Sequence, residues 1–248
     1  MSEPKTPASK TSSPTAPSKT ASGDVARAPS TTAEVDAFLN KVQSLQPATS
    51  GSGRLIFAMD ATMSRQPTWD LALGLQSEMF DAVKQVGGLD VQLMYFRGFG
   101  ECRSSKWVRD PDALARLMRQ VHCEGGHTQI RKVLSHAKKE TGRQTVNALV
   151  YVGDCMEESI DELCQLAGEL GLVRVPVFVF QEGHDTRAER ASRKSARLSR
   201  GAYCRFDAGS AAQLRALLTA VAVYASGGRK ALENAKSGAA TVLLEQLR

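Results

Sequence analysis

The sequence lacks an apolar run long enough to cross a lipid bilayer. Residues 1–10 are polar and include proline, so they do not contain the apolar core of a secretory signal. In the C-terminal half, the longest apolar stretch extends only from Ala216 to Ala225, whereas a spanning helix needs about 20 apolar residues. We therefore expect a cytoplasmic protein without a membrane anchor.

Cysteine is scarce, odd in number and irregularly spaced, which excludes the paired framework of a small secreted domain. We expect the five cysteines to be free thiols: Cys102, Cys123, Cys155, Cys164 and Cys204. A zinc site can be drawn from four residues, but it lacks the Cys-x-x-Cys pair of structural zinc sites and we do not expect it. Those residues are His122, Cys123, His127 and Cys155.

A strong excess of one charge is missing as well. The net charge is +6 with 23% charged residues, and so mild an excess does not by itself indicate nucleic acid. Residues 1–31 are rich in Ser, Thr, Pro, Ala and Lys and carry almost no large apolar side chain, so we expect a disordered tail. A short helix and a linker are predicted for 32–53, one folded domain for 54–225 and a C-terminal helix for 226–248.

Apolar strands alternate with amphipathic helices from residue 54 onward. Strands are predicted at 55–59, 91–96, 106–108, 146–152, 173–180 and 202–206, and the helices between them include 67–86 and 185–200. Because the central strands are apolar throughout, they predict a mostly parallel sheet covered by helices on both faces. The expected fold is a doubly wound, Rossmann-like α/β domain.

Oxygen-bearing side chains follow the ends of two predicted strands. Asp60 ends the first strand and precedes Thr62 and Ser64, while Asp154 ends the strand over 146–152. Alternate residues of an extended segment point to the same side, so Asp60, Thr62 and Ser64 are expected to converge. Thr128 supplies a further hydroxyl from a Gly-Gly loop. Hard oxygen donors of this kind suit Mg²⁺, or Mn²⁺, with one position left for an external anionic oxygen.

These residues resemble the metal-ion-dependent adhesion site of von Willebrand factor A (vWA) domains. The segment Asp60-Ala61-Thr62-Met63-Ser64 is similar to the family's DxSxS motif, Gly125–Thr128 to its threonine loop and Val152-Gly153-Asp154 to its last metal-site strand. The resemblance covers residues 54–224 approximately. It departs from the family at Gly153, where Thr is common, and at Cys155, where Gly is usual.

The resemblance implies both the sheet and the ligands. A six-stranded sheet is implied, with an antiparallel edge strand within 98–108. Thr62 and Ser64 would contact the metal directly, Asp60 and Asp154 mostly through water, and Thr128 in either way. A Glu or Asp of a partner protein would complete the coordination, and intracellular members often work with AAA-type ATPases or in multiprotein assemblies. We therefore predict a non-enzymatic, metal-dependent interaction module.

Three alternatives stay open at this point. Asp60 and Asp154 would otherwise only cap helices or bind loop amides. A metal-assisted phosphohydrolase would use the same ion, although a haloacid dehalogenase type needs an aspartate where Thr62 stands. The third is a basic accessory protein that binds nucleic acid or an acidic partner through one helix stripe. That stripe consists of Arg187, Arg190, Arg193, Lys194, Arg197 and Arg200.

Glu182 and Asp185 follow the strand over 173–180 and should lie on the same rim as the metal site. Two roles are open for them: surface loop charges, which is the commoner case, or residues that tune the choice of partner by repelling the wrong carboxylates. For the basic stripe we expect mainly a solvated helix face. Because no aromatic residues interleave with the stripe, single-stranded nucleic acid is disfavoured, and we do not expect nucleic acid to be the partner.

Overall fold

The computed structural model describes residues 52–84, 86–207 and 210–247. The tail predicted for 1–31 and nearly all of the segment predicted for 32–53 lie outside these residues. The strands are β1 (Gly53–Asp60), β2 (Leu89–Arg97), β3 (Glu101–Val108), β4 (Ala148–Gly153), β5 (Val177–Glu182) and β6 (Tyr203–Phe206). The helices are η1 (Met63–Arg65), α2 (Gln66–Val83), α3 (Pro111–Arg119), α4 (Ile130–Arg143), α5 (Ile160–Leu172), α6 (Thr186–Leu198), α7 (Ala211–Asn234) and α8 (Gly238–Leu244).

The strands form one sheet in the order β3-β2-β1-β4-β5-β6, with β3 antiparallel at the edge and every other neighbouring pair parallel. The expected six-stranded, doubly wound α/β fold is confirmed. The chain winds outward from β1 in one direction to β2 and β3, and in the other direction to β4, β5 and β6. The order therefore reverses between β1 and β4, where ligands bind in open sheets of this type.

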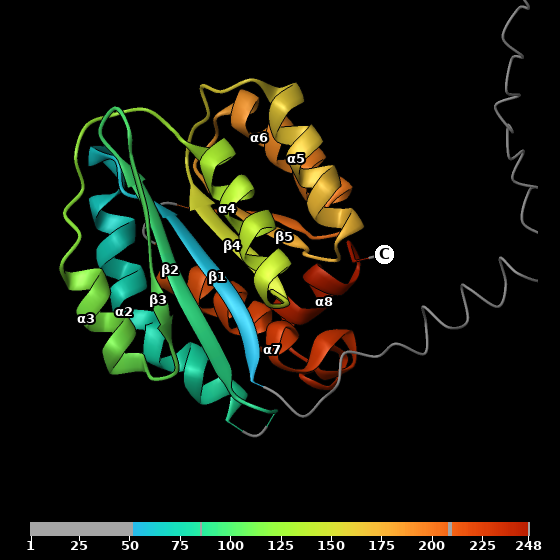
Figure 1. Cartoon of the computed structure of the whole chain (residues 1–248). Helices are drawn as coiled ribbons and strands as arrows, with labels where there is room; N and C mark the ends of the chain where they lie inside the picture. The colour runs from blue at the N-terminus through green and yellow to red at the C-terminus, as the bar shows by residue number, and fades with distance from the viewer. Residues whose placement is uncertain (1–51, 85, 208–209, 248) are drawn as a thin grey trace, which may run out of the picture. The chain divides into compact units, whose positions relative to one another are not determined.

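Each face of the sheet carries its own helices (Figure 1). Alternate residues of β1 point to opposite faces, so Leu55 and Phe57 pack with α2, α3, α7 and α8, while Ile56 and Ala58 pack with α4, α5 and α6. All four of these β1 side chains are fully buried. This two-sided burial explains why β1 is apolar throughout rather than alternating.

Several element ends differ from the prediction. The strand expected over 173–180 begins only at Val177, and Leu172 and Val173 are exposed at the end of α5. β3 is longer than the three residues predicted for it. Ser210 makes no side-chain cap to α7; Gln213 instead accepts a hydrogen bond from the amide of Asp207.

The C-terminal part is two helices rather than one. Residue 225 lies inside α7, which is kinked at Gly228 in the left-handed region (φ 67°) and ends at Asn234. Gly228 can adopt this conformation without the penalty that a Cβ imposes. Leu232 and Leu243 are fully buried, so the end of α7 and α8 pack on the domain. None of the described helices is both long and apolar enough to cross a membrane.

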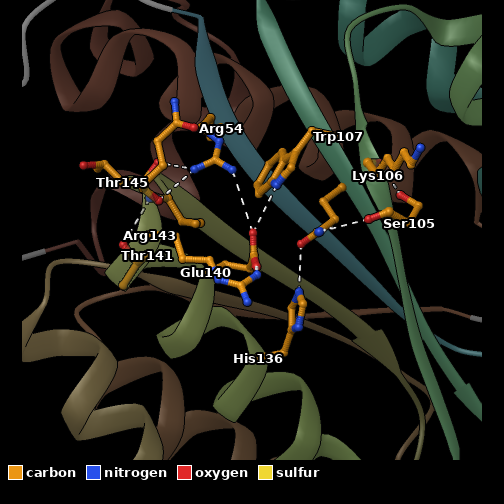
Figure 2. A network of polar contacts seen from close by, with 12 residues as sticks. Arg54, Ser105, Lys106, Trp107, His136, Glu140, Thr141, Arg143 and Thr145 are labelled. Atoms are coloured by element: carbon orange, nitrogen blue, oxygen red, sulfur yellow. Dashed lines mark hydrogen bonds and ion pairs between the residues drawn. The ribbon is translucent and has the colours of Figure 1, made fainter.

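A polar network ties β3 and α4 to the start of β1 (Figure 2). The Arg54 guanidinium lies 3.8 Å from the centre of the Trp107 ring and donates to the carbonyl of Gln144 at 2.7 Å. Glu140 accepts from the Trp107 indole at 3.2 Å and from Arg143 at 2.8 Å. Because Arg54 and Glu140 are both buried, their charges need these partners. The network fixes the end of the sheet opposite Asp60.

Candidate metal centre

The two predicted aspartates lie at neighbouring strand ends. Asp60 is the last residue of β1, and Asp154 follows the last residue of β4. β1 and β4 pair in parallel with Met59 opposite Val152, so both strands end at the same edge. One oxygen of Asp60, one oxygen of Asp154 and the Cys155 sulfur lie within 4.8 Å of one another. The sheet thus brings both carboxylates to the point where the strand order reverses.

The carboxylate of Asp60 is buried with one oxygen unpartnered. Its Oδ1 accepts a hydrogen bond from the Thr62 amide at 2.8 Å, while its Oδ2 has no protein partner. Burial raises the pKa of Asp60 from 3.8 to about 6, the Thr62 hydrogen bonds oppose this rise, and the charge of Asp154 adds to it. The site therefore holds a carboxylate whose negative charge is poorly compensated.

Ser64 lies in a 3₁₀ turn and not in the extended segment that was predicted. Thr62 is extended, but Met63–Arg65 form a 3₁₀ turn, so the alternation expected from an extended segment stops before Ser64. The Ser64 hydroxyl nevertheless donates to Asp154 Oδ2 at 3.3 Å. Asp154 Oδ1 is buried and has no partner. The turn thus brings the hydroxyl of Ser64 to one oxygen of Asp154 and leaves the other oxygen free.

Thr128 bonds to the loop that follows Asp154. Its hydroxyl accepts from the Glu157 amide at 3.2 Å, and its own amide donates to the Glu157 carboxylate at 3.0 Å. Glu158 accepts from the amides of Ile130 and Arg131 and so caps the start of α4. These bonds join the threonine loop to the Asp154 loop, and the Thr128 hydroxyl has one lone pair left over.

The two departures from the vWA pattern lie on either side of Asp154. A Cβ on Gly153 would lie 2.2 Å from the Tyr151 hydroxyl, so Tyr151 excludes the threonine common at that position. The Tyr151 hydroxyl is itself buried without a partner, and burial together with the nearby Asp60 raises the pKa of Tyr151. Burial, followed by the charge of Asp154, raises the pKa of the Cys155 thiol to about 12. Cys155 is therefore a neutral thiol beside two carboxylates.

The residues present fit a divalent cation. Asp60 Oδ2 and Asp154 Oδ1 are buried oxygens without partners in the same small group of side chains, and buried polar atoms are almost always satisfied. Two carboxylates and nearby hydroxyls are hard donors, which suit Mg²⁺ or Mn²⁺ better than a softer metal. Over the described residues, no other group of three His, Cys, Asp or Glu side chains converges in this way. The four-residue zinc site set aside above does not form there.

The predicted rim residues have bonds within the fold. Glu182, the last residue of β5, is 5% exposed and accepts hydrogen bonds from Arg65 and Thr68. Asp185 is exposed and caps α6 through the Ala188 amide. Their effect on partner choice stays a prediction, but Glu182 offers little surface to a partner.

The basic stripe is divided between different neighbours. Arg187 donates to the carbonyls of Glu157 and Glu158, next to the candidate metal centre. Arg193 pairs with Glu189 and lies 4.4 Å over the ring of Tyr203. A surface hollow of about 250 Å³ between α6 and α8 is lined by Arg193, Arg197 and Arg200. Arg190 and Lys194 lie on the same helix, the first exposed and the second half-buried.

Four features of the site were not predicted from the sequence. Arg65 contacts Asp154 Oδ2 at 3.1 Å and also pairs with Glu182, and Glu157 holds Thr128. Two apolar side chains are exposed: Met63, inside the motif, at 63% and Phe99 at 85%. Phe99 packs edge-on against His127, with ring centres 5.2 Å apart. Only the position of Met63 inside the motif was a usable signal, because the other contacts join distant segments.

No protein-family model matches the chain, and neither does any curated protein. Solved structures match it by fold. The SpRpn10 VWA domain is 11% identical with a TM-score of 0.55, and the match covers 66% of this chain and 94% of that one. Proximal thread matrix protein 1 from the mussel byssus, solved with a zinc-occupied MIDAS motif, is 15% identical with a TM-score of 0.57, over 77% of this chain and 51% of that one.

A third match is an aerotolerance-related membrane protein from Bacteroides fragilis NCTC 9343. It is 16% identical with a TM-score of 0.51, and the match covers 66% of this chain and 95% of that one. At such identities the likeness concerns the fold, and the sheet order with its antiparallel edge strand agrees with it. The chain therefore has the von Willebrand factor A fold.

Proposed function

We propose that this protein is a metal-dependent protein-interaction module. Mg²⁺, or Mn²⁺, would be held by Asp60, Thr62, Ser64, Thr128 and Asp154, acting directly or through water. The observation that carries the proposal is the pair of buried, unpartnered oxygens, Asp60 Oδ2 and Asp154 Oδ1, at adjacent strand ends. A cation would compensate the negative charge of the Asp60 carboxylate and would satisfy both oxygens.

The bound ion would present an electron-poor position to the outside, because part of its donor set is neutral hydroxyl groups. A Glu or Asp of a partner protein is the ligand that we propose for this position. Met63, inside the motif, and Phe99 are exposed and offer apolar contact to the residues that flank the partner's acid. We propose a protein assembly as the setting, with an AAA-type ATPase as one kind of partner.

We propose the cytoplasm as the place of action, which the five free cysteines support. The proposal includes no chemical step. A Mg²⁺-dependent phosphatase activity that survives purification and is lost in Asp154→Ala would contradict this part of it.

Thermal unfolding with and without Mg²⁺ tests the metal site. At 100 times its dissociation constant, a ligand of the native state should stabilise it by about 2.7 kcal/mol. We expect this stabilisation in the wild type and not in Asp60→Asn, which keeps the shape of the side chain but not its charge. A metal-induced shift of equal size in both proteins would show that the ion binds elsewhere.

A further inference from the structure

Arg65 places a fixed positive charge at the candidate metal centre. It is the last residue of η1 and directly follows Ser64. Its guanidinium lies 3.1 Å from Asp154 Oδ2, forms an ion pair with Glu182, and its Nε is 3.4 Å from the Ser64 hydroxyl. The side chain is only 11% exposed, so solvent screens this charge weakly.

The contacts of Arg65 determine which oxygen of Asp154 is free. Asp154 Oδ2 takes both the guanidinium and the Ser64 hydroxyl, while Oδ1 has no partner. Glu182 anchors the guanidinium from the end of β5 and is itself held by Thr68 of α2. Arg65 is therefore locked between two strand ends and cannot move away without leaving Glu182 buried and unpaired.

The charges of the site follow from this arrangement. Asp60, Asp154 and Glu182 are acidic and Arg65 is basic, so their formal charges sum to −2, and a divalent ion brings the group to zero. Without Arg65 the formal charge of the same group would be −3 before the ion binds and −1 after it has bound. An added negative charge attracts a cation more strongly and repels an incoming carboxylate.

We propose that Arg65 is a specificity-determining residue that lowers the affinity of the site for the metal ion and raises the affinity of the metal-loaded site for a carboxylate ligand. This inference rests on the proposed metal-dependent function. Arg65 would have opposite effects on metal binding and on carboxylate binding. A residue that only positions Asp154 would not have such opposite effects. The DxSxS motif that this sequence resembles ends at Ser64 and does not include Arg65.

The test compares Arg65→Gln with three matched proteins. Arg65→Gln keeps hydrogen-bond donors and removes the charge, and Arg65→Lys keeps the charge. Glu182→Gln removes one negative charge, and the double variant Arg65→Gln/Glu182→Gln has the same net charge as the wild type. Circular dichroism and thermal unfolding of the full chain check that each variant is folded.

Two affinities are measured, the first on metal-stripped protein and the second on the Mn²⁺-loaded protein. Calorimetry gives the affinity for Mn²⁺, and the relaxation of acetate methyl protons by bound Mn²⁺ gives the affinity of the loaded site for a carboxylate. In Arg65→Gln we expect Mn²⁺ to bind about fivefold or more tightly than in the wild type and acetate to bind weaker by a similar factor. Arg65→Lys should stay close to the wild type, and the double variant should return toward it in both measurements.

Weaker or unchanged Mn²⁺ binding in a folded Arg65→Gln would overturn the inference and leave Arg65 a merely structural residue. So would a double variant that is no closer to the wild type than the single variant. If the wild type itself binds no Mn²⁺, the proposed function fails, and that result differs from a wild type that binds Mn²⁺ with the same affinity as Arg65→Gln.

Discussion

Replacing Asp60 by asparagine should stabilise the metal-free protein at neutral pH while it removes the response to metal. The Asp60 carboxyl is 1% exposed and its Oδ2 has no partner. Asparagine keeps an oxygen that can accept from the Thr62 amide, which lies 2.8 Å from Oδ1. It removes only the charge that burial disfavours.

The magnitude follows from the pKa of Asp60, which burial raises from 3.8 to about 6. A raised carboxyl pKa contributes stability that is fully present below pH 3.8 and is lost as the pH rises through about 6. Between these two values the ionisation of Asp60 costs about 3 kcal/mol of folding free energy. Because the asparagine amide group must also find a hydrogen-bond partner, we expect a net gain of about 2 kcal/mol in Asp60→Asn at pH 7.

Urea unfolding of wild type and Asp60→Asn in EDTA at pH 4 and pH 7 measures this effect. The difference between the two proteins isolates Asp60, because all other titrating groups are common to both. Asp60→Asn should be the more stable protein at pH 7, and its advantage should disappear at pH 4. If the difference in unfolding free energy between the two proteins were the same at both pH values, the charge of the Asp60 carboxylate would not be uncompensated and the prediction would be refuted.

Three further predictions concern other parts of the molecule. In Gly126→Ala the new Cβ would lie 2.0 Å from the carbonyl oxygen of Gly98, so the threonine loop must move and Mn²⁺ affinity should fall at least about tenfold by calorimetry. Gly125→Ala is the control, since no atom lies within 4 Å of its Cβ, and an equal loss in both variants would contradict the argument. Glu140→Ala leaves Arg54 buried without its carboxylate and should cost about 3 kcal/mol in urea unfolding, whereas loss of the exposed Arg143 should cost less than about 1 kcal/mol. Phe99→Ser should change stability by less than about 0.5 kcal/mol, because the ring is 85% exposed, yet weaken binding to an isolated partner.

The fold was predictable because β1 and β4 have an unambiguous pattern. Both are buried on two faces, so their sequences are apolar runs. An aspartate is the last residue of β1 and another directly follows β4. Once the sheet is taken as parallel and doubly wound, Asp60 and Asp154 must share an edge. The sequence therefore predicts the two carboxylates of the candidate site without any contact being known.

The contacts around these aspartates were not predictable in the same way. Arg65 meets Asp154 and Glu182 across separations of 89 and 117 residues, and no local pattern marks such a pair. Glu182 was expected on the rim, but β5 continues through it and Arg65 covers it. Ser64 lies in a 3₁₀ turn that alternation cannot anticipate. Polar side chains at strand ends thus show where a site lies, while their partners depend on loops whose course only the structure gives.

Calorimetric titration of Mn²⁺ into the metal-stripped full chain, beside Asp60→Asn and the exposed-loop control Gly125→Ala, tests the metal centre most directly. We expect saturable binding at one site in the wild type and in Gly125→Ala, and none in Asp60→Asn. No binding in the folded wild type, or equal binding in Asp60→Asn, would contradict the claim that the unpartnered oxygens of Asp60 and Asp154 form a metal centre.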